Sequence, residues 1–209
     1  MKVVGFSGSP RKNGNTAYLV RAALAEMERN GVETGFVPLC EYAFGDCLGC
    51  EGCRESCRCV VRDDMQKLYP LVDEADALIL GSPTYFYDVT AIMKAFLDRM
   101  YCYEVFHGED RSVWMSVNEA LGGKLAAVLS VCEQERAEDT GYAAKTMSLT
   151  LSSLGYRVVD SAEILHLFGR EEAAADNEAI DRAKRMGRRL ARTMRLKRAI
   201  RQRIEGQGT

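Results

Sequence analysis

The sequence predicts an α/β fold in which five parallel strands form a doubly wound sheet with strand order 2-1-3-4-5. Short apolar stretches alternate with helix-forming stretches five times along the 209 residues. The apolar stretches lack the polar alternation of a half-exposed sheet, as expected when helices cover both faces. Five such strands suit the order 2-1-3-4-5. A composition of 47% hydrophobic and 28% charged residues is typical of a globular domain.

The first half of the chain is predicted to hold three strands and three helices. Residues 16–29 are strong helix formers, and Asn30-Gly31 is a plausible end for that helix. Asp63-Asp64 and Thr90 precede the next two helices, where their side chains can accept free backbone N–H groups. The predicted elements are, in order, a strand over 2–6, a helix over 16–29, a strand over 32–37 that ends at Pro38, a helix over 65–75, a strand over 77–81 and a helix over 91–101.

The second half is predicted to hold two further strands and two helices. The strands cover 124–131 and about 156–160, and a helix over about 139–154 connects them. The final helix begins past Glu171 and extends to about residue 204. Residues 102–123 have no predicted element, and so long a loop in a compact domain is often functional.

Residues 1–170 are predicted to form the main body, with a cysteine-rich loop over 40–62, and residues 171–209 a basic C-terminal helix of the same domain. Residues 1–180 hold 17 Lys and Arg and 28 Asp and Glu, whereas residues 181–209 hold 11 basic and two acidic residues. The simplest interpretation is that the last helix covers the sheet and has one solvated face. The extension of this helix past residue 195 also suits packing on another subunit or on the acidic body. Binding to nucleic acid or to a membrane surface is the weakest interpretation.

A cytoplasmic protein is expected. No apolar run approaches the roughly 18 residues that a membrane span needs. The N-terminal apolar stretch is too short for a signal peptide and leads directly into a Gly/Ser loop. No membrane partner is therefore predicted, and nucleic acid is not the favoured partner of the basic helix.

A polar loop between the first strand and the first helix is a candidate phosphate site. Ligands of such folds bind at the carboxyl ends of the strands, and a helix N-terminus attracts anions. The loop lacks the Lys-Ser/Thr of a Walker A motif and the spacing of GxGxxG. The alternative is a plain strand-to-helix turn. The short polar side chains of this loop are Ser7, Ser9, Asn13, Asn15 and Thr16, and its positive charges are Arg11 and Lys12.

Three adjacent aromatic residues, Tyr85, Phe86 and Tyr87, follow the third predicted strand. They could simply pack in the core. However, three neighbours in one loop cannot all point inward, so some are expected to face outward, where a flat ring could stack on them.

Five of the eight cysteines lie between residues 47 and 59, in the pattern C-x2-C-x2-C-x3-C-x-C. Without a secretion signal, such a cluster indicates a metal or redox site rather than disulfides. The match to a ferredoxin run is partial, because Arg58 rather than Pro follows Cys57. The alternatives are a zinc site and a vestigial loop without metal. The other cysteines, Cys40, Cys102 and Cys132, are interpreted as buried or incidental thiols.

Two motifs resemble the NADPH-dependent FMN reductase family of the flavodoxin-like superfamily, over about residues 1–165. The first is Gly8-Ser9-Pro10-Arg11 with Gly14-Asn15-Thr16, and the second is Gly81-Ser82-Pro83-Thr84-Tyr85-Phe86 followed by the segment 91–99. The resemblance implies that the first loop holds the FMN phosphate and that the second lies against the flavin ring. The implied FMN-binding residues are Ser7, Ser9, Pro10, Arg11, Asn13, Asn15, Thr16, Pro83, Thr84, Tyr85 and Phe86.

The cysteine pattern resembles that of the iron–sulfur flavoproteins, a branch of the same group. The resemblance implies that a [4Fe–4S] cluster is bound by Cys47, Cys50, Cys53 and Cys59, with Cys59 preferred to Cys57 as fourth ligand. It also implies an electron carrier that forms dimers or tetramers. Its redox partner would be a protein such as ferredoxin or a small-molecule acceptor. In the strand order 2-1-3, the cysteine loop is expected near the flavin or near that of a neighbouring subunit.

The segment Cys132–Glu138 departs from the family, because it is acidic and lacks glycine where many relatives have a glycine-rich flavin contact. This departure weakens the expectation of NAD(P)H use. No side chain is predicted to be catalytic, since the cofactor carries flavin chemistry. The first function hypothesis is an FMN-dependent oxidoreductase with a cluster. The alternatives are an NAD(P)H-dependent FMN or quinone reductase with a structural or vestigial cysteine loop, and a non-catalytic flavin- or metal-binding regulatory module.

Overall fold

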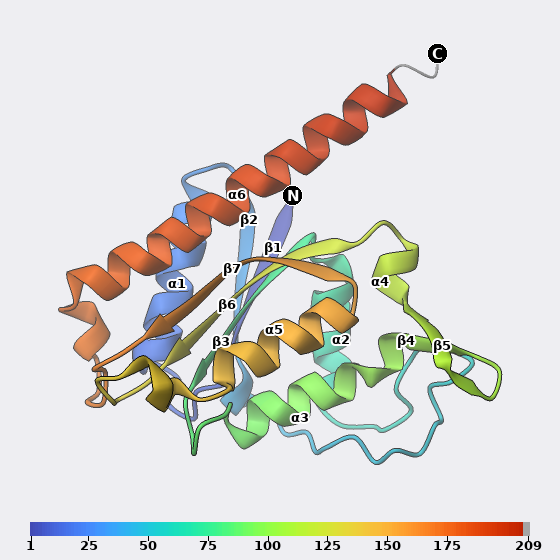
Figure 1. Cartoon of the computed structure of the whole chain (residues 1–209), viewed down its shortest axis with the longest axis horizontal. Coiled ribbons are helices and arrows are strands. Elements are labelled where there is room, and N and C mark those ends of the chain that lie inside the picture. Colours follow the sequence, from blue (N-terminus) through green and yellow to red (C-terminus); the bar gives the residue numbers. More distant parts are fainter. Residues whose placement is uncertain (207–209) are drawn as a thin grey trace.

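Five parallel strands form the central sheet of the computed structural model, which describes residues 1–206 (Figure 1). Their spatial order is β2-β1-β3-β6-β7, which is 2-1-3-4-5 when only these strands are counted. The predicted fold class is therefore confirmed. The strands are β1 (Lys2–Ser7), β2 (Glu33–Pro38), β3 (Ala77–Pro83), β6 (Lys124–Val131) and β7 (Tyr156–Ile164).

Helices cover both faces of the sheet, and each face has its own apolar core. The helices are α1 (Asn15–Glu28) and α6 (Asn177–Glu205) on one face, and α2 (Met65–Glu74), α3 (Ala91–Arg99) and α5 (Ala143–Ser153) on the other. Alternate residues of β3 enter the two cores, with Leu78 in one and Ile79 in the other. This two-sided burial explains why the central strands β1, β3 and β6 are mostly apolar runs.

The helix starts follow the predicted capping with one exchange. The Thr90 side chain accepts the N–H of Met93 at 3.3 Å, as predicted for α3. At α2 the carboxylate of Asp63 accepts the N–H of Met65 at 3.0 Å, whereas Asp64 accepts that of Ala43 at 2.9 Å. Only the first of the two aspartates therefore caps α2, and the second holds the start of the cysteine loop.

Two boundaries in the second half differ from the prediction. Strand β7 continues to Ile164 rather than ending near 160, because β6 pairs with it along its whole length. Helix α5 begins at Ala143 rather than near 139, because Gly141 has a φ of 58° and separates it from a 3-10 turn, η3 (Ala137–Thr140). The other short turns are η1 (Leu39–Glu41), η2 (Met100–Tyr103) and η4 (Glu172–Ala174).

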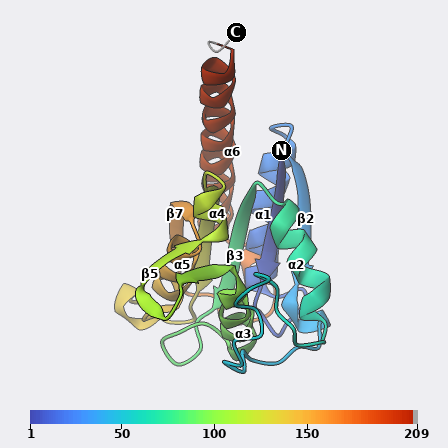
Figure 2. The same ribbon diagram turned by 90° about the vertical axis from the view of Figure 1, so that its right-hand side faces the viewer.

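Residues 102–123, predicted to be a loop, contain an antiparallel hairpin. It consists of β4 (Glu104–His107) and β5 (Asp110–Ser116), and a single helical turn, α4 (Val117–Ala120), follows it. Most of β5 is exposed, so the segment lacks the apolar run that indicates a buried strand. The hairpin lies at the edge of the molecule, beside the cysteine loop (Figure 2).

Helix α6 has 29 residues and extends well beyond the sheet (Figure 1). Its buried face packs on α1 and ends at Met194, whereas Leu196, Ile200 and Ile204 are exposed. The predicted end near 204 agrees with the structure. Residues 207–209 of the predicted basic segment lie outside the described part of the chain. Among residues 1–206, no helix combines the length and apolarity needed to cross a bilayer.

Replacing Gly187 with Ala is expected to destabilise the fold. A Cβ there would lie inside contact distance of the Ala23 carbonyl oxygen, so α6 and α1 would have to separate. Overpacking costs roughly 1–3 kcal/mol, and the better helix propensity of Ala returns up to about 1 kcal/mol. We expect a net loss of about 1–2 kcal/mol in urea unfolding. Gly35→Ala is the control, because its Cβ would meet only Val4 at 3.8 Å; equal losses in both variants would contradict the prediction.

Candidate functional site

A cavity at the carboxyl edge of the sheet brings together seven of the eleven residues predicted to bind FMN. We call it the carboxyl-edge cavity. Strands β1 and β3 are direct neighbours, so the loops that follow them meet at this edge. The seven residues are Ser9, Arg11, Asn15, Thr16, Pro83, Thr84 and Tyr85.

The loop after β1 is held by backbone contacts that leave the start of α1 open. The N–H of Gly8 donates to Gly81 O at 2.8 Å, and the Thr90 hydroxyl donates to Gly8 O at 2.7 Å. The N-cap of α1 is Gly14, which has no side chain to accept the first free N–H groups, and the first turn holds no acidic residue. These N–H groups and the positive end of the helix dipole suit a phosphate.

One buried hydroxyl in the cavity wall has no partner. Thr84 Oγ1 is inaccessible to solvent and makes no hydrogen bond within residues 1–206. A buried polar atom without a partner costs about 1–3 kcal/mol, so such atoms usually meet a water or a ligand. The open helix start and this hydroxyl fit a ligand that has a phosphate at one end and polar ring atoms at the other, as FMN has.

The aromatic loop after β3 is exposed, as predicted. The exposed fractions of Tyr85, Phe86 and Tyr87 are 50%, 100% and 60%. Phe86 and Tyr87 have φ values of 44° and 65°, a strained conformation for large side chains that is common at ligand sites. The Tyr87 carbonyl accepts the N–H of Tyr142 at 2.6 Å, which fixes the loop. Of the three rings, Tyr85 lines the cavity.

Four of the predicted FMN-binding residues do not line the cavity: Ser7, Pro10, Asn13 and Phe86. The Ser7 hydroxyl accepts the N–H of Ser9 at 3.4 Å, and the Asn13 side chain accepts Arg21 Nη1 at 3.3 Å. These contacts, one within the loop and one to Arg21 of α1, indicate that Ser7 and Asn13 support the shape of the loop. Phe86 projects into solvent beside the cavity.

Besides Gly14, the N-cap of α1, four lining residues were not predicted: Val131, Glu133, Leu167 and Phe168. They lie at or just after the carboxyl ends of β6 and β7, a position that could have identified them. Arg11 Nη1 donates to Phe168 O at 3.1 Å, and Asn15 Nδ2 donates to Gly169 O at 2.8 Å. Glu133 belongs to the acidic segment noted in the sequence, so that segment does put a carboxylate in the cavity wall.

The four cysteines predicted as cluster ligands all line a second cavity. Cys57 does not line it. We call it the cysteine cavity. Cys47 and Cys50 are exposed, and Cys53 and Cys59 are half-buried. Within residues 1–206, no three His, Cys, Asp or Glu side chains converge closely enough to hold a metal. The thiol donor set fits an iron–sulfur cluster chemically, and its membership favours Cys59 over Cys57.

The surroundings of Cys59, Cys53 and Cys102 shift their pKa values in different directions. Burial of the Cys59 thiol raises its pKa, but the neighbouring Val61 N–H, Tyr69 and Arg99 hold that pKa below the usual value. Burial raises the pKa of Cys53, and it raises the pKa of Cys102, which also lines the cavity, to about 12. Cys102 is thus a buried thiol, as predicted.

The two cavities lie at opposite ends of α3. Thr90, at its start, contacts the loop after β1, and Arg99, its last residue, lines the cysteine cavity. Nine helical residues span roughly 14 Å. The cysteine loop starts beside the first loop, where Lys12 pairs with Glu41, and then runs along α3 to the β4–β5 hairpin (Figure 1). The cysteine cavity is therefore separated from the carboxyl-edge cavity of the same chain by the length of α3.

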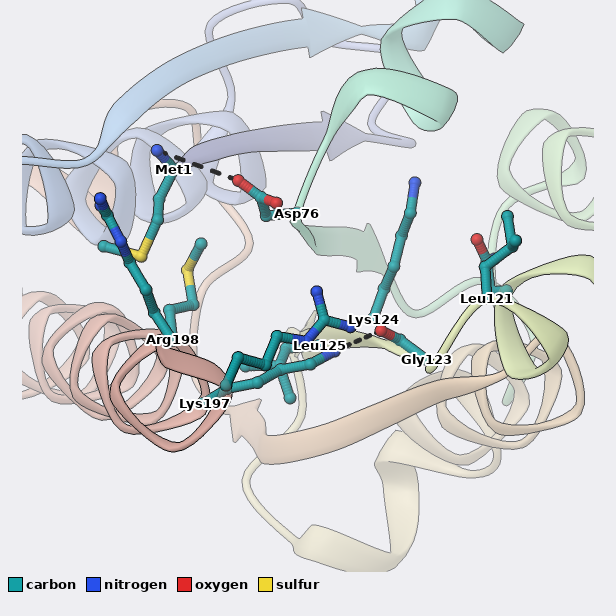
Figure 3. Close-up of a pocket in the computed structure, with 11 residues that line it drawn as sticks. Met1, Asp76, Leu121, Gly123, Lys124, Leu125, Lys197 and Arg198 are labelled. Carbon is teal, nitrogen blue, oxygen red and sulfur yellow. Dashed lines mark hydrogen bonds and ion pairs between the residues drawn. The ribbon is translucent and has the colours of Figure 1, made fainter. Parts of the chain in front are cut away.

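A third hollow lies at the amino edge of the sheet and contains none of the predicted site residues (Figure 3). The amino group of Met1 lies 4.0 Å from Asp76, and Lys197 donates to the carbonyl of Gly123. Its other cations are Lys124, Arg198 and Arg201. Its place, opposite the edge where ligands of this fold bind, separates it from the site above.

The sheet order and the ligand cavity at its carboxyl edge define a flavodoxin-like protein. Similar solved structures include a flavone reductase (TM-score 0.70, 18% identity, covering 93% of this chain and 63% of that one) and a flavodoxin from the domain Archaea (TM-score 0.60, 18% identity, 93% and 99%). Residues 1–165 match the family model described as NADPH-dependent FMN reductase. The chain belongs to this family, as the motifs predicted.

Curated relatives carry the name iron–sulfur flavoprotein, which confirms the resemblance drawn from the cysteine pattern. One from Methanocaldococcus jannaschii is 46% identical over 99 residues, covering 47% of this chain and 51% of the relative. One from Archaeoglobus fulgidus is 48% identical over 103 residues, covering 49% and 47%. The matched stretch thus spans about half the length of these relatives.

Proposed function

We propose that the protein is an FMN-dependent oxidoreductase that transfers electrons and carries a [4Fe–4S] cluster in addition to FMN. The observation that carries the proposal is the sorting of the predicted residues into two cavities. The FMN-binding motifs meet at the carboxyl-edge cavity, and Cys47, Cys50, Cys53 and Cys59 meet at the cysteine cavity. The family and the names of the relatives support the same conclusion.

FMN exchanges one or two electrons and a [4Fe–4S] cluster exchanges single electrons, so together they would connect two-electron and one-electron partners. The start of α1 and Arg11 would hold the phosphate, and Thr84 Oγ1 would gain a hydrogen-bond partner. Tyr85 would cover part of the ring system. The carboxylate of Glu133 would repel negative charge on a reduced flavin and would therefore lower the reduction potential of the flavin.

A simple NAD(P)H-dependent FMN or quinone reductase is the second candidate. It is favoured by the incomplete convergence of the cysteines. In that case the cysteine loop would have a structural role, held by Gln66 Nε2 donating to the carbonyls of Cys59 and Val61 at 2.9 and 2.7 Å.

Anaerobic purification with flavin, iron and sulfide assays distinguishes the two candidates. The proposal expects one FMN with about four irons and four sulfides per chain. Flavin with steady NADH or NADPH turnover but without iron would establish the reductase instead. Zinc in place of iron would make the cysteine loop a structural metal site, and neither flavin nor metal would refute both candidates.

We also propose that α6 joins two copies of the chain. The projecting turns of α6 are strongly basic, expose Leu196, Ile200 and Ile204, and are complementary in charge to the acidic body of a second copy. The redox partner of the protein would be a protein such as ferredoxin or a small-molecule acceptor.

Changing the three exposed residues Leu196, Ile200 and Ile204 to Lys is expected to convert the oligomer to single chains. The change removes the apolar contacts and adds like charge to the helix. Light scattering would report a fall to the mass of one chain. The matched control is Leu149→Lys, an exposed leucine of α5 that is 60% accessible. A wild-type protein that is already a single chain, or a triple variant that stays assembled, would refute the interface.

A further inference from the structure

A buried guanidinium forms part of the wall of the cysteine cavity. Arg99 is the last residue of α3, and its side chain has no exposure to solvent. Its two terminal nitrogens are satisfied: Nη1 donates to Asp63 at 2.5 Å and to Gly45 O at 3.0 Å, and Nη2 donates to Asp63 at 3.0 Å. A two-point ion pair of this kind fixes the orientation of the guanidinium plane.

The remaining nitrogen, Nε, is buried and has no hydrogen-bond partner in the described part of the chain. A buried donor is unfavourable unless it meets an acceptor, so this atom indicates a group that the protein alone does not supply. Arg99 and Cys59 line the same cysteine cavity. The free donor is therefore available to a sulfur in the cysteine cavity.

The same ion pair joins both ends of the cysteine loop to α3. Gly45 precedes the first of the four cysteines and Asp63 follows the last one. Asp63 accepts the N–H groups of Gly45 at 3.2 Å and Met65 at 3.0 Å while it pairs with Arg99. Arg99 itself donates to Gly45 O, so one side chain holds the two points between which the cysteines lie.

We propose that Arg99 is a positioning residue of the cluster site, which closes the cysteine loop through Asp63 and presents its Nε–H to sulfur beside Cys59. This inference rests on the cluster of the proposed function. When one electron enters from a reductant, negative charge is added and no bond is made or broken. A fixed positive charge and a hydrogen-bond donor to sulfur stabilise that added charge and raise the reduction potential.

Arg99→Lys tests the proposal, because it keeps the charge and the reach to Asp63 but removes Nε–H. Arg111→Lys is the matched control: Arg111 pairs with Glu51 of the same loop at 2.7 Å but does not line the cysteine cavity. The readouts are iron content and an EPR-monitored dithionite titration of the intact holoprotein. The flavin potential serves as an internal control. In Arg99→Lys we expect the reduction potential of the cluster to fall by about 59 mV, which is a tenfold shift of the equilibrium toward the oxidised cluster. In Arg111→Lys we expect no shift of that potential.

The outcomes separate a site role from a general structural one. Iron retained with an unchanged cluster potential would overturn the proposal. If Arg99→Lys loses iron, the urea unfolding midpoint and the FMN affinity of the cluster-free variant are measured next. Wild-type values of both would support a role confined to the cluster site. A lower midpoint together with a weaker FMN affinity would assign Arg99 to the fold and overturn the inference. A wild-type protein without iron refutes the proposed cluster itself, and this is seen before any variant is made.

Discussion

Changing Cys59 to Ser is expected to remove the iron from the protein while FMN stays bound. Serine is a poor ligand for iron in place of a thiolate, and three thiols do not complete the set that a [4Fe–4S] cluster needs. Iron should fall from about four per chain to near zero, and the cluster absorption should vanish with it. The flavin content should not change, because Cys59 lies at the far end of α3 from the carboxyl-edge cavity.

Cys57→Ser is the matched control, since it makes the same change two residues away. Cys57 does not line the cysteine cavity, so its variant should keep the wild-type iron and sulfide. The reverse result, with iron lost from Cys57→Ser and kept by Cys59→Ser, would reassign the fourth ligand. Equal partial losses in both variants would indicate that the loop folds around the cluster without a unique fourth thiol.

The covered parallel sheet was predictable because its physical cause is visible in the sequence. The central strands β1, β3 and β6 are buried on both faces, so each appears as a short apolar run. Thr90 caps α3 with the side chain expected there. The hairpin of residues 104–116 was not predictable in this way. Its second strand is mostly exposed and forms only a two-stranded sheet, so no hydrophobic period identifies it.

The candidate site was predictable only where a loop motif carries it. Glycine, Ser, Pro and Asn at fixed spacing identified Ser9, Asn15, Pro83 and Thr84, all of which line the carboxyl-edge cavity. Phe168 reaches the same cavity through the fold of the segment after β7, and only its position beyond that strand, not a residue motif, indicates it. Arg99 was visible only as part of a helix motif, because its role depends on Asp63 and on tertiary burial.

Reversing the charge of Arg11 is expected to weaken FMN binding at least about tenfold, or ~1.4 kcal/mol. Arg11 lines the carboxyl-edge cavity beside the open start of α1, where a phosphate would sit. Arg11→Glu removes a charge-assisted hydrogen bond and places a carboxylate near the phosphate. Because the side chain is exposed, the loss should shrink as salt is added. Fluorescence titration of the flavin-free protein would measure the dissociation constants.

Lys12→Glu makes the same charge change one residue further on and separates a local contact from the overall field. Lys12 pairs with Glu41 and does not line the cavity, so its variant should lose no more than about twofold in FMN affinity. Riboflavin, which has no phosphate, should bind both variants as it binds the wild type. Equal losses of FMN affinity in the two variants would mean that the phosphate senses only the net charge of the loop. A loss of riboflavin affinity in Arg11→Glu would instead place Arg11 against the ring, through its link to the carbonyl of Phe168.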